Sequence, residues 1–162
     1  MTMRSLKWIA PVVLGLASFA MLRGQDATAA APGYSCGLNA SYIFLNRTGH
    51  HVPYEKLARE MGSQSQPDSM LAIKKVLAEH GCETVGVKTN ADFFLQNKGP
   101  AIVHLQLSGY SFHPEDHFTY LVGASRQTGA EVLDPVFNVK TAAYISWLTF
   151  SQSYQGAALI LK

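Results

Sequence analysis

The pattern of apolar residues changes at Gly81, and this change restricts the fold more than any other feature of the chain. Before it, three stretches beginning near Ser35, Pro53 and Pro67 have apolar residues three or four positions apart, as amphipathic helices do. After it, short runs of β-forming residues alternate with turns, and the short turns after Pro100 favour antiparallel pairing. Helices followed by an antiparallel sheet predict an α+β domain.

The half of the chain after Gly81 divides into five expected strands and three other segments. The stretch from Ala101 to Leu107 alternates in character, which places its odd-numbered residues on one face of a strand. The strands are expected at residues 84–87, 101–107, 117–123, 130–133 and 157–161, with a short capped helix over 90–97, a loop over 108–116 and an amphipathic segment over 144–150.

The first 29 residues have the three parts of a secretory signal peptide. Arg4 and Lys7 are basic, residues 8–22 form an apolar run, and Ala27-Thr28-Ala29 matches the small-x-small site of signal peptidase. A membrane span needs about 20 apolar residues, so the fifteen residues from 8 to 22 favour a cleaved signal over a retained anchor. The sequence predicts export to the periplasm or the cell exterior, with membrane contact only through this segment.

Cleavage after Ala29 would leave residues 30–162 as one domain with its own core. It would remove three of the 13 Lys and Arg residues and one of the 11 Asp and Glu residues, leaving ten of each. A domain without excess positive charge lacks the electrostatic attraction that nucleic-acid binding requires. We therefore expect no nucleic-acid partner.

Cys36 follows Ser35, a residue type that caps helix N-termini, and is therefore expected in the first turn of a helix. Partial positive charge and free N–H groups at a helix N-terminus stabilise a thiolate and lower the pKa of cysteines placed there. The same N–H groups can bind an oxyanion. Cys36 is therefore a candidate nucleophile, although a disulfide with Cys82 or an inert core thiol would also explain it.

His117 and Asp134 are the candidate partners of this thiol. His117 begins a predicted strand and Asp134 ends the next, and in an antiparallel hairpin these two positions lie side by side. A histidine that takes the thiol proton and a carboxylate that orients the histidine would complete a catalytic triad with Cys36.

Other interpretations of these residues, as structural or metal-binding groups, remain open. His117 could be a structural histidine, and Asp134 could simply form the turn before Pro135. A metal site built from His113, Asp116 and His117, or from His50 and His51, matches no established zinc spacing, and no metal or cofactor is expected. His104 lies within a strand and is interpreted as structural, and Cys82 as a core thiol.

Four segments, in order, resemble those of the peptidase C39 family, which are papain-like cysteine proteases best known as leader-cleaving domains of bacteriocin exporters. The resemblance runs from about residue 35 to residue 161, with 81 residues from Cys36 to His117 and 17 from His117 to Asp134. The segments are Cys36-Gly37 with Ala40, Gly99-Pro100-Ala101-Ile102-Val103-His104-Leu105, His117-Phe118-Thr119-Tyr120-Leu121-Val122-Gly123, and Val132-Leu133-Asp134-Pro135.

The resemblance implies a papain-like fold and a thiol peptidase that cleaves a peptide or protein, with Cys36 as nucleophile, His117 as base and Asp134 as orienting residue. The family usually has a glutamine six residues before the nucleophile that donates to the oxyanion, and here that position is Ala30. The substitution predicts weak activity, and no fused transporter is expected in a chain that ends at Lys162. The alternatives are a non-catalytic peptide-binding module and another papain-like amidase or acyl transferase.

Overall fold

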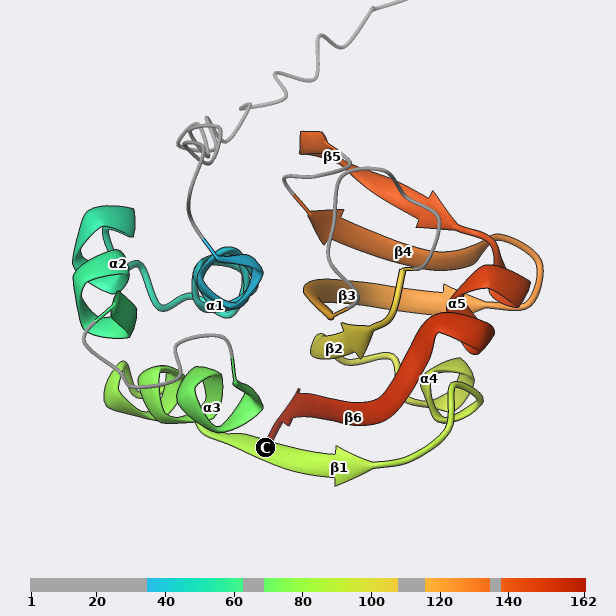
Figure 1. Cartoon of the computed structure of the whole chain (residues 1–162), viewed down its shortest axis with the longest axis horizontal. Coiled ribbons are helices and arrows are strands. Elements are labelled where there is room, and N and C mark those ends of the chain that lie inside the picture. The colour runs from blue at the N-terminus through green and yellow to red at the C-terminus, as the bar shows by residue number, and fades with distance from the viewer. Residues whose placement is uncertain (1–34, 63–68, 108–115, 135–137) are drawn as a thin grey trace, which may run out of the picture.

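The computed structural model describes residues 35–62, 69–107, 116–134 and 138–162, so the expected signal peptide, Ala30 and most of the expected loop over 108–116 lie outside the described residues. Three helices precede the first strand and lie together on one side of the molecule (Figure 1). They are α1 (Cys36–Arg47), α2 (Tyr54–Gly62) and α3 (Met70–Glu79).

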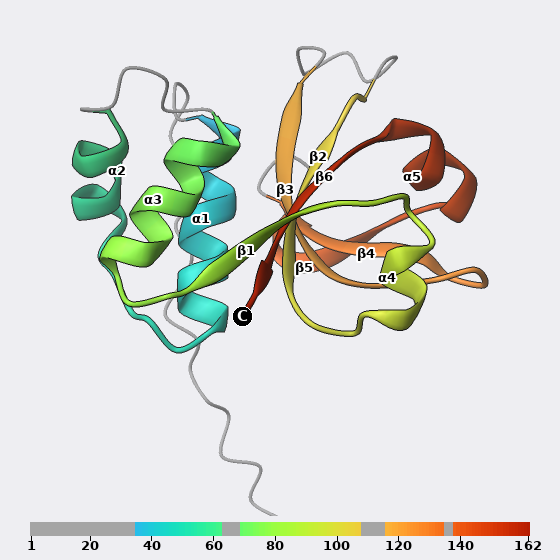
Figure 2. The ribbon, with the colours of Figure 1, turned by 90° about the horizontal axis from the view of Figure 1, so that it is seen from below.

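The second half is a six-stranded sheet in the order β1-β6-β2-β3-β4-β5, in which every neighbouring pair is antiparallel. Figure 2 shows this sheet beside the helical half. The strands are β1 (Thr84–Lys88), β2 (Ala101–Leu105), β3 (His117–Ser125), β4 (Gly129–Asp134), β5 (Asn138–Ile145) and β6 (Tyr154–Leu161), with short helices α4 (Phe93–Gln96) and α5 (Trp147–Ser153) between them. The predicted α+β architecture is confirmed.

Serine side chains set the starts of α1 and α3. Ser35 caps α1 by accepting a hydrogen bond from the Leu38 N–H at 3.1 Å, as the sequence predicts. Ser69 caps α3 in the same way, and this helix begins at Met70, three residues after the start that the sequence predicts. The expected helix over residues 90–97 is also shorter in the structure and forms only the single turn of α4.

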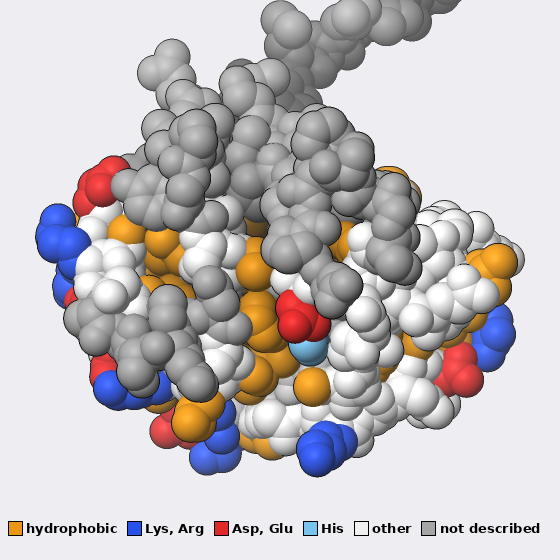
Figure 3. Space-filling view, in the orientation of Figure 1, with side chains coloured by type: hydrophobic (Ala, Val, Ile, Leu, Met, Phe, Trp, Pro, Cys, Tyr) orange, Lys and Arg blue, Asp and Glu red, His pale blue; other side chains and the backbone are white. Residues whose placement is uncertain are grey.

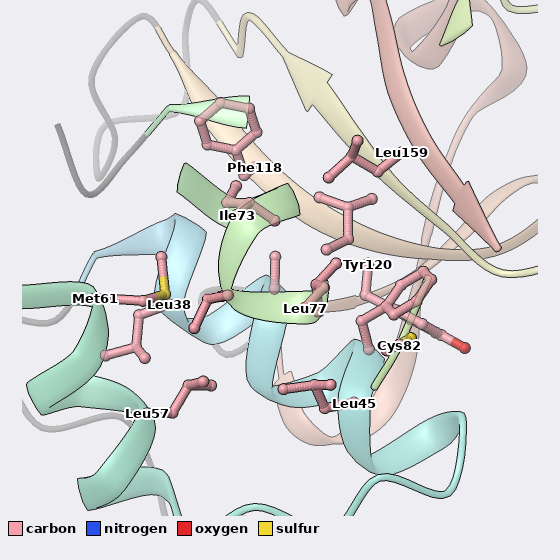
Figure 4. Close-up of a cluster of buried hydrophobic side chains, with 14 of the residues drawn as sticks. Leu38, Leu45, Leu57, Met61, Ile73, Leu77, Cys82, Phe118, Tyr120 and Leu159 are labelled. Atoms are coloured by element: carbon pink, nitrogen blue, oxygen red, sulfur yellow. The ribbon is translucent and has the colours of Figure 1, made fainter. Parts of the chain in front are cut away.

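Two hydrophobic cores lie on opposite faces of the sheet. The first joins the helices to the sheet and includes Ile102 of β2. Figure 4 shows two of its other members, Leu45 of α1 and Ile73 of α3. The second includes Phe94 of α4 and Phe150 of α5, together with Ala101, Val103 and Leu105 of β2. The prediction that the odd-numbered residues of this strand share one face is confirmed. Helices also cover the opposite face, so every residue of β2 except His104 is buried.

The edge strand β5 is the main error of the sequence prediction. Residues 144–150 were expected as one amphipathic segment, but Tyr144 and Ile145 end β5, and α5 begins two residues later. Ser146 separates the two elements and caps α5 by accepting from the Thr149 N–H at 3.2 Å. A short apolar run fits strand and helix equally well, so its periodicity did not reveal this boundary. The closing strand β6 also starts earlier than predicted, at Tyr154.

The glycine that begins β4 predicts a large loss of stability for Gly129→Ala. Gly129 has φ +87°, and a Cβ there would lie 2.0 Å from the backbone oxygen of Ile145. We expect the free energy of unfolding to fall by about 3 kcal/mol or more, measured by urea denaturation. Gly49→Ala is the matched control, because Gly49 has φ +88° and open space around it. The control should lose only about 1–2 kcal/mol from backbone strain, and equal losses in both variants would contradict the clash.

Candidate active site

Cys36 is the first residue of α1, and its thiol is partly exposed. The Ser35 cap takes the N–H of Leu38 through its side chain and the N–H of Asn39 through its carbonyl oxygen. The N–H of Cys36 itself has no acceptor among the described residues. The predicted first-turn position is thus confirmed, and it combines a thiol with a free backbone donor.

His117 and Asp134 meet at one end of the sheet, as the hairpin geometry predicts. The Nε2 atom of His117 lies 2.5 Å from Oδ2 of Asp134. The antiparallel pairing of β3 with β4 brings the start of one strand beside the end of the other. Both residues are buried, with exposed fractions of 1% and 4%. Their hydrogen bond therefore forms largely out of contact with water, where a charged partner strengthens it.

The protonation of His117 depends on Asp134 and on Cys36. Burial is the largest single influence and lowers the pKa of His117. Hydrogen bonds to Asp134 and to Cys36, together with the negative charges of both groups, outweigh burial and raise this pKa from 6.5 to about 9. Because Nε2 is bonded to Asp134, the buried Nδ1 atom is the nitrogen that faces the thiol. The structure therefore brings the three predicted residues together, and their catalytic roles remain predictions.

Cys82 is not the disulfide partner of Cys36, because both thiols are free. Cys82 lies in the core between the helices and the sheet, is only 1% exposed, and has its sulfur 3.6 Å from Oγ1 of Thr48. The prediction of a core thiol is confirmed.

His104 and Asp116 form a second histidine–aspartate pair close to the first along the chain. Nε2 of His104 lies 3.1 Å from Oδ1 of Asp116, and the imidazole stacks on Phe118 with the ring centres 4.8 Å apart. These contacts agree with the structural interpretation of His104. His113 lies outside the described residues, and within those residues no group of three or more His, Cys, Asp and Glu side chains has an arrangement that would hold a metal ion.

Asn39 is a buried polar residue near the nucleophile that sequence reasoning missed. It lies three residues after Cys36 on α1, is 9% exposed, and accepts a hydrogen bond from the Tyr54 hydroxyl at 2.7 Å. The only signal in the sequence was a polar residue between Leu38 and Ala40. Its partner comes from a different helix, and the sequence does not predict that contact.

Hydrophobic side chains gather between the helical half and the sheet, while charged side chains lie mainly around the outer rim (Figure 3). Each helix in the described ranges is too short or too polar to cross a membrane.

The sequence model of the peptidase C39 family matches residues 27–162, while none of the curated proteins matches the chain. Among solved structures, the peptidase domain of Streptococcus ComA, a bi-functional ABC transporter of a quorum sensing pathway, is 21% identical with a TM-score of 0.64, covering 78% of this chain and 90% of that one.

Two further structures have the same fold. A double glycine motif protease from an AMS/PCAT transporter, in complex with the leader peptide, is 24% identical with a TM-score of 0.63, covering 79% of this chain and 84% of that one. The N-terminal peptidase C39 like domain of a toxin secretion ATP-binding protein from Vibrio parahaemolyticus is 16% identical with a TM-score of 0.61, covering 80% and 97% respectively. At these identities the structures establish the papain-like fold alone.

Proposed function

Because the chain belongs to the peptidase C39 family, we propose that it is a cysteine peptidase in which Cys36, His117 and Asp134 hydrolyse a peptide bond. The observation that carries this proposal is the position of His117, which is hydrogen-bonded to Asp134 and has its pKa raised by both Asp134 and Cys36. A buried imidazole between a thiol and a carboxylate is the arrangement that activates a cysteine nucleophile.

The geometry supports a two-step reaction. The Cys36 thiolate attacks the carbonyl carbon, the carbonyl electron pair moves to oxygen, and the Cys36 N–H stabilises the resulting oxyanion. His117 then gives its proton to the leaving amine, which leaves an acyl group on the sulfur. The neutral His117 next takes a proton from water, and the hydroxide releases the acyl group as a carboxylic acid. Asp134 holds the Nε2–H of His117, which keeps Nδ1 directed toward the thiol.

The raised pKa of His117 gives a prediction that does not depend on a substrate. We expect His117 to titrate near pH 9, followed by NMR of ¹³C-labelled histidine, because the Asp134 and Cys36 contacts favour its charged form. The contacts that raise this pKa from 6.5 to about 9 also stabilise the folded protein. Their stabilisation is complete below pH 6.5 and is lost as the pH rises through 9. Titration of His117 near 6.5 in the folded protein would mean that the two contacts do not form in solution.

A peptide or protein substrate is the remaining part of this proposal. It is supported by family membership, and by the leader peptide bound to one of the similar structures. The test is incubation of the purified protein, and of Cys36→Ala, with a proteome-derived peptide library, with new peptide ends read by mass spectrometry. The proposal requires ends that appear with the wild type only. Identical peptide ends in both samples would refute a Cys36-dependent peptidase.

A non-catalytic peptide-binding module is the second candidate function, and Ala30 at the usual glutamine position favours it. Such a module would retain peptides from the same library without cutting them. A third alternative, an amidase or acyl transferase, would acylate Cys36 with small activated esters yet leave peptide bonds intact.

The N-terminal pattern supports export as a further part of the proposal. We expect the protein isolated from its own host to begin at Ala30, because Ala27-Thr28-Ala29 matches a signal peptidase site. N-terminal sequencing of the exported fraction measures this directly, and Ala29→Arg should block the processing. A protein that keeps Met1 and stays with the membranes would instead use residues 8–22 as an anchor.

A further inference from the structure

Asn39 is a buried amide beside the nucleophile that the triad does not use. It lies one helical turn after Cys36 on α1, and side chains three positions apart on a helix are neighbours. Helical side chains lean toward the N-terminus, so the Asn39 side chain covers the turn that contains Cys36. A buried polar group near a reactive thiol calls for a specific role, because burying an amide without partners costs free energy.

The orientation of the Asn39 amide is set by Tyr54. The Tyr54 hydroxyl donates to Oδ1 of Asn39 at 2.7 Å, and the Tyr54 ring packs edge-on against Tyr42 with the ring centres 5.0 Å apart. Tyr42 lies on the side of Asn39 that faces away from Cys36 along α1. With the amide oxygen bonded to Tyr54, the amide nitrogen is the part of the Asn39 side chain left to face the turn that contains Cys36. Nδ2 has no acceptor among the described residues.

Cys36 therefore has the imidazole on one side and this amide on the other. A residue eight positions after Cys36 is rotated about 80° from it around the helix axis, and a residue three positions after it is rotated about 60° in the opposite direction. Phe44, at the first of these positions, packs against Tyr120 of β3, the strand that carries His117. Asn39, at the second, contacts Tyr54 of α2. An acyl group attacked by the thiolate would thus have its oxygen on the side away from the base.

We propose that Nδ2 of Asn39 is the side-chain donor to the oxyanion, with Tyr54 as a positioning residue that orients it; the inference rests on the proposed peptidase function. During attack, the sulfur lone pair forms the S–C bond, and the C=O π pair moves to oxygen. The oxyanion accepts hydrogen bonds from the Cys36 N–H and from Asn39. When it collapses, the pair returns to the C=O bond, and the bond to the leaving group breaks. Asn39 thereby supplies a side-chain donor in a chain that has Ala30 at the usual glutamine position.

The test compares two small reagents that react with the same thiol. p-Nitrophenyl acetate acylates Cys36 through an oxyanion and releases p-nitrophenolate, whereas iodoacetamide alkylates it by displacement of iodide, without an oxyanion. The ratio of the two rates at one pH cancels the amount of thiolate present. Loss of one oxyanion donor lowers turnover by about 10² to 10³, so this ratio should fall by about 10² in Asn39→Ala. The rate of alkylation alone should change by no more than about twofold, because this reaction forms no oxyanion. A general disturbance of the site would instead slow both reactions.

Three further variants make the result specific. Asn39→Asp keeps an acceptor for Tyr54 and suits the first turns of a helix, so it preserves the fold while removing the donor, and its ratio should also fall. Tyr54→Phe should lower the ratio less, because the amide stays but is no longer oriented. Asn46→Ala is the matched control, since Asn46 is an amide seven residues further along α1 whose Nδ2 donates to the Tyr42 carbonyl at 2.8 Å. Its ratio should equal that of the wild type.

Two outcomes would overturn the inference, and they separate it from the proposed function. If the wild type shows Cys36-dependent acylation but the Asn39 variants keep the ratio of Asn46→Ala, the peptidase proposal stands and the role of Asn39 is refuted. If Cys36→Ala releases p-nitrophenolate as fast as the wild type, both proposals are refuted.

Discussion

His117→Gln should lower turnover on a cleaved peptide by roughly 10⁴ to 10⁶, because glutamine neither takes nor gives the proton that both reaction steps require. Glutamine can still donate to Asp134, so the buried carboxylate keeps a partner and the fold should persist. Turnover is measured by mass spectrometry of product formation, with thermal unfolding followed in parallel.

His104→Gln is the matched control for this change. His104 is also paired with an aspartate, Asp116 at 3.1 Å, but it contacts neither Cys36 nor Asp134 among the described residues. Its replacement should leave turnover within a few-fold of the wild type. Equal losses for His104→Gln and His117→Gln would indicate a general effect on the sheet and not the loss of a base.

Asp134→Asn is the second change with a large expected effect, a fall in turnover of roughly 10² to 10⁴. Asparagine removes the negative charge that favours protonated His117 and no longer enforces the tautomer with Nδ1 toward the thiol. The lower part of this range applies if the thiolate supplies part of the stabilisation of the imidazolium, as the contribution of Cys36 to the His117 pKa indicates.

The same variant should change the pH dependence. The Asp134 hydrogen bond is the largest influence that raises the pKa of His117, so without it the alkaline loss of activity should move below pH 9. Asp116→Asn removes the exposed carboxylate of the second histidine–aspartate pair, and it should leave the alkaline loss of activity at the same pH as in the wild type. An Asp134→Asn enzyme with unchanged turnover and pH profile would remove Asp134 from the mechanism.

The parts of the site that the sequence predicted depend on local rules. Ser35 and Cys36 follow helix-capping preferences, which involve only a few neighbouring residues. His117 and Asp134 flank a short hairpin, and antiparallel pairing alone places such positions together.

The parts that were missed depend on contacts between distant segments. The Tyr54 hydroxyl reaches Asn39 only because α2 packs against α1, and nothing near Asn39 in the sequence indicates that contact. Both faces of β2 are buried because helices from both ends of the chain cover them. The pairing of β6 with both β1 and β2 likewise joins the last strand to much earlier ones, and no local pattern specifies its order in the sheet.

The central claim is that His117 activates Cys36, and the rate of iodoacetamide alkylation of Cys36 as a function of pH, in the wild type and in His117→Gln, tests it most directly. Mass spectrometry assigns the label to Cys36 and separates it from the buried Cys82. If the two residues form a thiolate–imidazolium pair, alkylation at pH 6 should be at least about tenfold faster in the wild type than in His117→Gln, and the two rates should converge above pH 9. Superimposable profiles for the two proteins, both rising like an ordinary thiol with a midpoint of about 8.5, would contradict the account.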